Sequence, residues 1–170
     1  MAETMDDPRD LFFHELGDIL YAERTITKLL PTFKKEVTDQ ELKDGFDRHL
    51  EETKGQISNV EQVFKSMGEK VKAERCPGID GIKQEHDQFV EEEKPSPDVL
   101  QLFVTGSAAR VEHYEIASYS GLVAAAKAMG ETEAAALLEE NLKQEQQMAK
   151  DGEKIAKRLL KASAGQGASA

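Results

Sequence analysis

Four segments of this 170-residue chain carry apolar residues at alternating steps of three and four. That spacing keeps side chains on one face of an α-helix, because the helix repeats every ~3.6 residues. The segments extend over Pro8–Val37, Asp39–Gly68, Pro97–Gly130 and Glu131–Lys161. A long amphipathic helix is stable only when its apolar face is covered, and helices of similar length cover one another side by side. The spacing therefore predicts an all-α four-helix bundle.

Helix start and stop signals stand near the ends of these segments. Thr38 and Glu41 have the spacing of a capping box at the start of the second segment, and Gly68 is suited to end it. Ser96 precedes a proline that fits the first turn of the third helix. Pro31 lies inside the first segment and is expected to kink that helix without ending it.

A link of about 28 residues separates the second and third helices, whereas the other links are short. A link of this length can carry the chain along the whole bundle as a crossover. It contains apolar-face positions at steps of three, four and three, namely Ile79, Ile82, His86 and Phe89. We expect a short amphipathic helix here, covered at the twofold interface of a homodimer. Residues 1–162 are predicted to form one domain, and residues 163–170 a flexible C-terminal tail.

Charge and composition narrow the partners and the compartment. Asp and Glu number 33 against 22 Lys and Arg, a formal net charge of −11 that disfavours nucleic acid and anionic membranes. We see neither a signal peptide nor an apolar run long enough to span a membrane. Cys76 is the only cysteine, which excludes an intrachain disulfide. The sequence therefore indicates a cytoplasmic protein.

The four apolar faces become polar in the middle of each predicted helix. A helix midpoint stays at the midpoint whichever way the helix runs, so these polar residues should meet in one layer of the bundle. The residues expected in the layer are Glu23, His49, Glu52, Thr53, Gln56, Glu112, Glu115 and Glu145.

A layer of buried carboxylates needs a source of compensating charge. Burying each ionised carboxylate alone costs several kcal/mol, so the layer must be protonated, paired or metal-bound. No Lys or Arg lies on the four faces, and carboxylate oxygens with one imidazole suit iron or manganese. Two divalent metal ions are the hypothesis that the residues favour, and a protonated or water-filled layer is the alternative. His49 can be a ligand or a hydrogen-bonded core residue, and Tyr119 can bond a ligand or simply pack.

Four stretches resemble the YciF/YciE-like bacterial stress proteins of the ferritin-like superfamily. They are residues 15–23 (ELGDILYAE), 49–53 (HLEET), 76–78 (CPG) and 111–117 (VEHYEIA). The resemblance covers about residues 8–160 and implies a ferritin-like bundle, a homodimer and expression linked to stress. It does not define a biochemical activity.

The pattern of the wider superfamily implies specific ligands. Each of the four helices would contribute one metal-binding carboxylate, and these are Glu23, Glu52, Glu112 and Glu145. Glu115 resembles an additional carboxylate of rubrerythrin-like proteins. The histidines of the usual Glu-x-x-His motifs are replaced here by Gly55 and Met148. His49, one turn before Glu52, is the substitute donor that remains.

The complete set of expected metal ligands is Glu23, His49, Glu52, Glu112, Glu115 and Glu145. The first functional hypothesis is a dimetal protein that handles iron or manganese together with dioxygen or peroxide. Any oxidoreductase chemistry would be that of the metals. A module that only sequesters metal, and a metal-free structural or partner-binding dimer, are the rivals. No catalytic residue is assigned, and His14, His86 and His113 are expected at the surface or at an interface.

Overall fold

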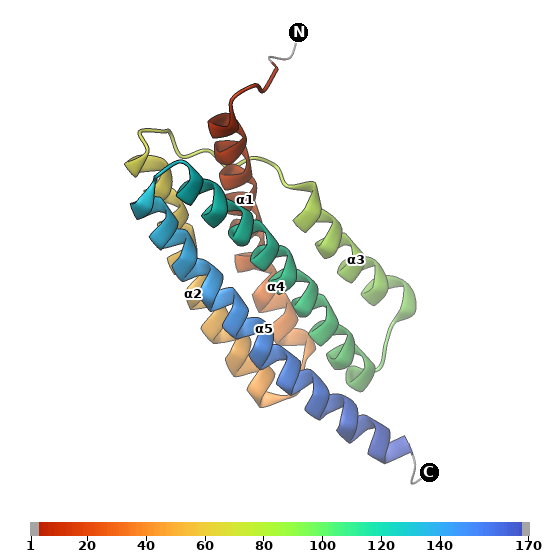
Figure 1. Cartoon of the computed structure of the whole chain (residues 1–170). Helices are drawn as coiled ribbons and strands as arrows, with labels where there is room; N and C mark the ends of the chain where they lie inside the picture. The colour runs from red at the N-terminus through yellow and green to blue at the C-terminus, as the bar shows by residue number, and fades with distance from the viewer. Residues whose placement is uncertain (1–3, 168–170) are drawn as a thin grey trace.

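The computed structural model describes residues 4–167, and all the regular secondary structure in that range is helical (Figure 1). The five helices are α1 (Pro8–Glu36), α2 (Gln40–Ser66), α3 (Pro77–Glu93), α4 (Pro97–Ala128) and α5 (Thr132–Gly167). The predicted all-α class is confirmed. Within the described range, no helix combines the length and apolarity needed to cross a membrane.

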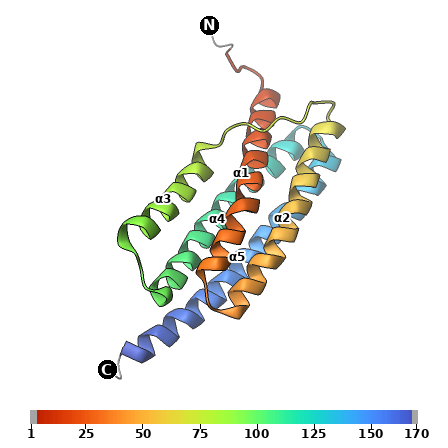
Figure 2. The same cartoon turned by 180° about the vertical axis from the view of Figure 1, so that it is seen from behind.

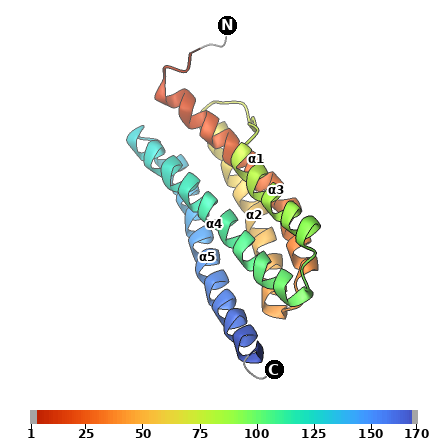
Figure 3. The ribbon, with the colours of Figure 1, turned by 90° about the vertical axis from the view of Figure 1, so that its right-hand side faces the viewer.

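The four long helices lie side by side, and α3 lies outside them (Figures 1 and 2). α1 contacts α2 and α4, and α5 contacts the same two helices from the other side. The chain between α2 and α4 returns along the length of the molecule, so that these two helices run in the same direction. Figure 3 shows α3 beside α4 and α1, the two helices that it contacts.

The helix ends follow local capping chemistry, with one difference from the sequence prediction. Asp39 is the N-cap of α2, and its Oδ1 accepts a hydrogen bond from the Leu42 amide at 3.1 Å. The Thr38–Glu41 capping box was wrong, because the Thr38 hydroxyl instead donates to Gln101 on α4 at 3.0 Å. Gly68 has φ of 80° after α2, a conformation that glycine adopts without strain.

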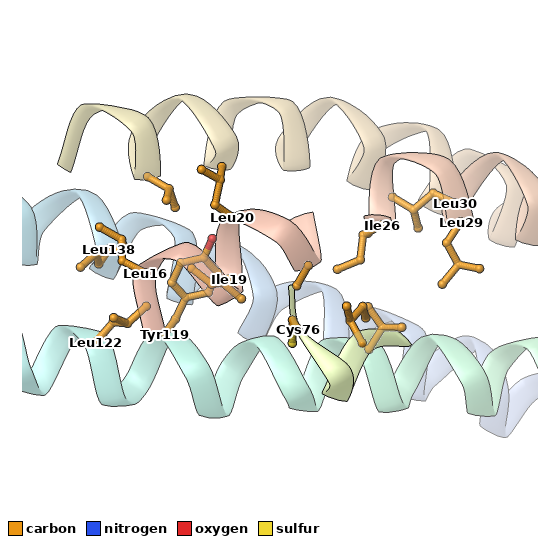
Figure 4. Close-up of a cluster of buried hydrophobic side chains, with 14 of the residues drawn as sticks. Leu16, Ile19, Leu20, Ile26, Leu29, Leu30, Cys76, Tyr119, Leu122 and Leu138 are labelled. Carbon is orange, nitrogen blue, oxygen red and sulfur yellow. The ribbon is translucent and has the colours of Figure 1, made fainter. Parts of the chain in front are cut away.

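Apolar residues fill the interior on both sides of the polar layer. Leu16, Ile19 and Leu20 pack near Tyr119 on one side, and Ile26, Leu29 and Leu30 lie further along α1 on the other (Figure 4). Burying each such side chain contributes roughly 1.5–3 kcal/mol. The glutamates between these two apolar regions are buried, apart from the half-buried Glu52.

The link between α2 and α4 is fastened to the helices of its own chain. The amide of Glu74 donates to the carbonyl of Gly17 at 3.0 Å, where α1 has no side chain to hold the link away. Ile79 is buried, whereas Ile82 and Phe89 are half-buried. Much of the apolar side of α3 is thus covered within the chain, so that covering it does not by itself require a second copy.

His86 differs from the expectation of a surface or interface histidine. It is buried within the chain, with Nδ1 3.1 Å from Ser107 Oγ and Nε2 2.9 Å from Glu36 Oε2. Its ring lies against Phe33, with centroids 4.7 Å apart. His14 and His113 are exposed, as expected.

The last helix is longer than predicted, and its buried face includes a polar residue. α5 continues to Gly167, whereas Lys161 was the expected end; residues 168–170 of the expected tail lie outside the described residues. Asn141 is buried one turn after Leu138, whereas its neighbour Leu142 is half-buried. Either residue fits the helical spacing after Leu138. Asn141 is the buried one because Tyr119 and Gln56 offer it hydrogen-bond partners in the interior.

Candidate metal centre

Four buried side chains from α2, α4 and α5 converge halfway along the molecule. His49, Glu112, Glu115 and Glu145 can each offer one ligand atom, and these atoms all lie within 4.8 Å of one another. His49 Nδ1 is 3.1 Å from Glu112 Oε1, and His49 Nε2 is 3.5 Å from Glu145 Oε2. Residues far apart in the sequence thus form one compact donor set.

The other two expected ligands lie beside this donor set. Glu23 on α1 is fully buried, accepts a hydrogen bond from the Tyr119 hydroxyl and interacts electrostatically with Glu145 and Glu112. Glu52 on α2 is half-buried and interacts with Glu145 through space. The structure therefore places five of the expected residues in the interior and Glu52 at its edge.

A network of amides orients the carboxylates. The side-chain amide of Gln56 donates to Glu145 Oε1. The amide of Asn141 donates to the Tyr119 hydroxyl at 3.0 Å and to the Gln56 carbonyl at 3.3 Å, and its oxygen accepts from Asn59 at 2.8 Å. Sequence reasoning missed Asn141; its place one turn before Glu145 on the same helix was the available signal.

Several oxygens at the centre have no hydrogen-bond donor. They are Glu23 Oε2, Glu112 Oε2, both oxygens of Glu115 and Glu145 Oε2, and the His49 ring nitrogens also lack hydrogen bonds of good geometry. No Lys or Arg is buried in the described part of the chain, so His49 is the only buried candidate for a balancing charge at this centre. A hard or intermediate divalent cation, which prefers carboxylate oxygen with imidazole nitrogen, fits this unsatisfied donor set.

The metal-free centre divides its protons unequally. Burial raises the pKa of Glu23 to about 8 and that of Glu112 to about 7, and burial together with Glu145 raises the pKa of Glu115 well above 4.5. Burial alone would lower the pKa of His49, but the carboxylates of Glu112 and Glu145 together outweigh burial and raise that pKa well above 6.5. Burial alone would raise the pKa of Glu145, but His49, with hydrogen bonds from Glu112 and Gln56, outweighs burial and lowers that pKa. Without metal, ionised Glu145 therefore faces protonated His49.

The fold and this centre define an all-α protein with a buried His/Glu cluster that could hold a metal ion. Residues 7–165 match the family described as "Domain of unknown function (DUF892)". Protein YciF of Escherichia coli K12 is 36% identical over 143 residues, which cover 84% of this chain and 86% of that protein. The chain belongs to the DUF892 family and is a relative of YciF, which confirms the resemblance indicated by the sequence.

Solved structures agree with this assignment. The crystal structure described as that of the E. coli stress protein YciF matches with a TM-score of 0.86 at 32% identity, covering 92% of this chain and 99% of that one. YcfI from Rhodopseudomonas palustris matches with a TM-score of 0.86 at 37% identity, covering 90% of this chain and 97% of that one. A protein from Xanthomonas campestris pv. campestris shares the fold, with a TM-score of 0.75 at 24% identity over 94% and 98% of the chains.

Proposed function

We propose that α1, α2, α4 and α5 form a ferritin-like four-helix bundle and that its centre binds two divalent metal ions, iron or manganese. The proposed ligands are Glu23, His49, Glu52, Glu112, Glu115 and Glu145. The observation that carries the proposal is the group of buried carboxylate oxygens that converge on His49 without hydrogen-bond donors. Two divalent cations would neutralise most of the charge of five carboxylates and would use the oxygens that the protein leaves unpaired.

Bound iron or manganese would supply reactivity toward dioxygen or peroxide, and the protein would act in metal and oxygen handling during stress. The chain's own residues have supporting roles. Gln56 and Tyr119 hold Glu145 and Glu23 in position through hydrogen bonds, and the apolar regions on both sides limit access of water. The description of its relative YciF as a stress protein supports the physiological setting. We propose that the protein is cytoplasmic and forms a homodimer. Light scattering tests the homodimer, and a monomeric mass at micromolar concentration contradicts it.

Elemental analysis of protein purified without chelators tests the metal centre. We expect about two iron or manganese ions per chain, and fewer in Glu52→Ala and Glu145→Ala. Glu69→Ala is the matched control, because Glu69 is exposed in the link after α2. Metal content near zero for the wild type would refute the proposal and leave the metal-free structural dimer.

Aerobic reoxidation separates turnover from storage. A ferrous-loaded protein that cycles repeatedly with an added reductant is an oxidoreductase, whereas one that oxidises its iron once and retains it is a sequestration protein. The proposal of oxygen or peroxide handling is refuted if the loaded ferrous protein does not react with either oxidant.

A further inference from the structure

A pocket of about 730 Å³ lies between α2, α4 and α5, next to the candidate metal centre. Its volume falls within the ~300–1,000 Å³ range of small-molecule sites. Glu112 lines the pocket and also belongs to the buried donor set of the centre. The pocket is therefore continuous with the layer in which the metals would lie.

Small residues on the two facing helices leave this space open. Gly106 and Ala109 on α4 line the pocket, as do Gly152 and Ala156 on α5. A Cβ added at Gly152 would meet no heavy atom within 4 Å, and one added at Gly106 would meet only Arg110 Nη1, at 3.7 Å. No side chain of the protein fills these positions, so the space is available to another molecule.

The two ends of the pocket differ in polarity. Arg48 and Glu112 line it at the height of the metal layer, and Lys150 lies about 7.5 Å from that height along α5. Leu42 and Leu102 line the pocket toward the N-terminal ends of α2 and α4. With a rise of ~1.5 Å per residue, Leu102 lies about 15 Å from Glu112 along α4. A molecule that fits both ends has a polar head and an apolar tail.

The charges at the polar end favour a negative head. The acids Asp151 and Glu153 at the pocket already form ion pairs, with Lys154 at 2.9 Å and Lys157 at 2.6 Å. Arg48 and Lys150 form no ion pair or hydrogen bond within residues 4–167, although Arg48 interacts through space with Asp151 and Glu52. Two available cations at an apolar pocket are distinctive in a chain whose net charge is −11.

We propose that this pocket binds an aliphatic molecule with an anionic head, a medium-chain carboxylate, with its head near Arg48 and Lys150 and its tail toward Leu42 and Leu102. This binding assigns a substrate class to the proposed metal centre, and it rests on the proposed function only in placing the head beside bound metal. The complementarity is electrostatic at one end and apolar at the other.

Displacement of a fluorescent dansylaminoundecanoate by decanoate tests the pocket in the full chain. We expect saturable binding, with decanoate about tenfold or more tighter than decanol, because the alcohol lacks the charge that Arg48 and Lys150 attract. Decyltrimethylammonium, which has the same tail and the opposite charge, should not displace the probe. Equal displacement by all three compounds, or no saturable binding, overturns the proposal.

Gly152→Leu should fill the pocket without unfolding the helix, since leucine is the better helix former. We expect it to weaken decanoate binding about tenfold or more. Gly121→Leu is the matched control, because Gly121 on α4 is exposed, has open space around it and does not line the pocket. Lys150→Gln should remove much of the preference for decanoate over decanol, and the exposed Lys143→Gln should not. If Gly152→Leu keeps decanoate affinity but halves the particle mass, this face is an interface between copies and the proposal is wrong.

Metal analysis of the same samples keeps the two proposals apart. Metal in the wild type without decanoate binding overturns the pocket and leaves the metal centre intact. Decanoate binding that is lost in Gly152→Leu, in protein that takes up no metal, supports the pocket and refutes the proposed function. In Co²⁺-loaded protein, decanoate should alter the visible spectrum of wild type and not of Gly152→Leu; an unchanged spectrum in the wild type overturns the placement of the head beside the metal.

Discussion

Replacing Glu112 by glutamine should stabilise the metal-free protein at alkaline pH. Burial raises the pKa of Glu112 from 4.5 to about 7, so the folded chain holds this proton more tightly than the unfolded chain. Its stabilising contribution is fully present below pH 4.5 and is lost as the pH rises through about 7. The difference between the two pKa values corresponds to at most about 3 kcal/mol at pH 8.

Glutamine keeps the shape of the side chain and cannot ionise. Because the substitution also removes the carboxylate next to His49 Nδ1, we expect a net gain of about 1–3 kcal/mol in the free energy of unfolding at pH 8, and little or no gain at pH 4.5. For a chain of this size the gain corresponds to roughly 3–10 °C in melting temperature. Thermal melts followed by circular dichroism, in the presence of chelator, measure it.

Bound metal should reverse this order of stability, so that the wild type becomes more stable than Glu112→Gln. The wild type should gain about 2.7 kcal/mol at a free metal concentration a hundred times its dissociation constant, and Glu112→Gln should gain less because it lacks one ligand oxygen. Glu69→Gln, in the exposed link after α2, should behave as wild type throughout. The reasoning is refuted if Glu112→Gln is less stable than wild type at pH 8 without metal and both proteins gain equally when metal is added.

Three further predictions concern the centre and the fold around it. Burial raises the pKa of Glu23 to about 8, so metal binding at pH 7 should release protons and tighten as the pH rises from 6 to 8; identical calorimetric enthalpies in phosphate and Tris buffers would show that no proton is released. Tyr119→Phe removes the donor to Glu23 and the acceptor for Asn141, and it should lower the free energy of unfolding in denaturant by about 1–3 kcal/mol. Tyr21→Phe, at the half-buried contact with Asp80, should lower it less, and equal losses in the two variants would contradict a role for burial. Gly17→Ala should destabilise the fold by about 1–3 kcal/mol, because the new Cβ would lie 2.9 Å from the Lys72 carbonyl oxygen. Gly121→Ala, which has open space around it, should stabilise the fold by roughly 0.5–1 kcal/mol, and the packing argument is wrong if both variants gain stability.

The sequence was sufficient to predict the helices and the depth of the polar layer, because both depend on spacing along single helices. Glu23, Glu112, Glu115 and Glu145 are buried as expected, since each stands on the apolar face near its helix midpoint. The sequence did not reveal that Asn141, and not its neighbour Leu142, is the buried residue. Both positions fit the helical spacing, and only the partners on other helices, Tyr119 and Gln56, decide which one faces inward.

Contacts between segments distant in sequence account for the other differences between the sequence prediction and the structure. His86 is buried because Glu36 of α1 and Ser107 of α4 supply partners for both ring nitrogens, and nothing within α3 indicates this. Thr38 does not cap α2, because Gln101 of α4 captures its hydroxyl. The pocket beside Glu112 was also not foreseen, since it depends on the spacing between α4 and α5 and not on either helix alone.

The distribution of protons explains how such a centre can fold before metal arrives. Near neutral pH the charges of ionised Glu145 and protonated His49 cancel, and raised pKa values keep Glu23 and Glu115 protonated and Glu112 partly so. The metal-free layer is therefore close to neutral, and the cost of burying it is much smaller than that of five carboxylates buried as ions. Metal would replace these protons and leave the layer again close to neutral. Protons and metal ions thus bind alternatively to the same buried carboxylates. This protein, unlike a zinc finger, should therefore fold without its metal.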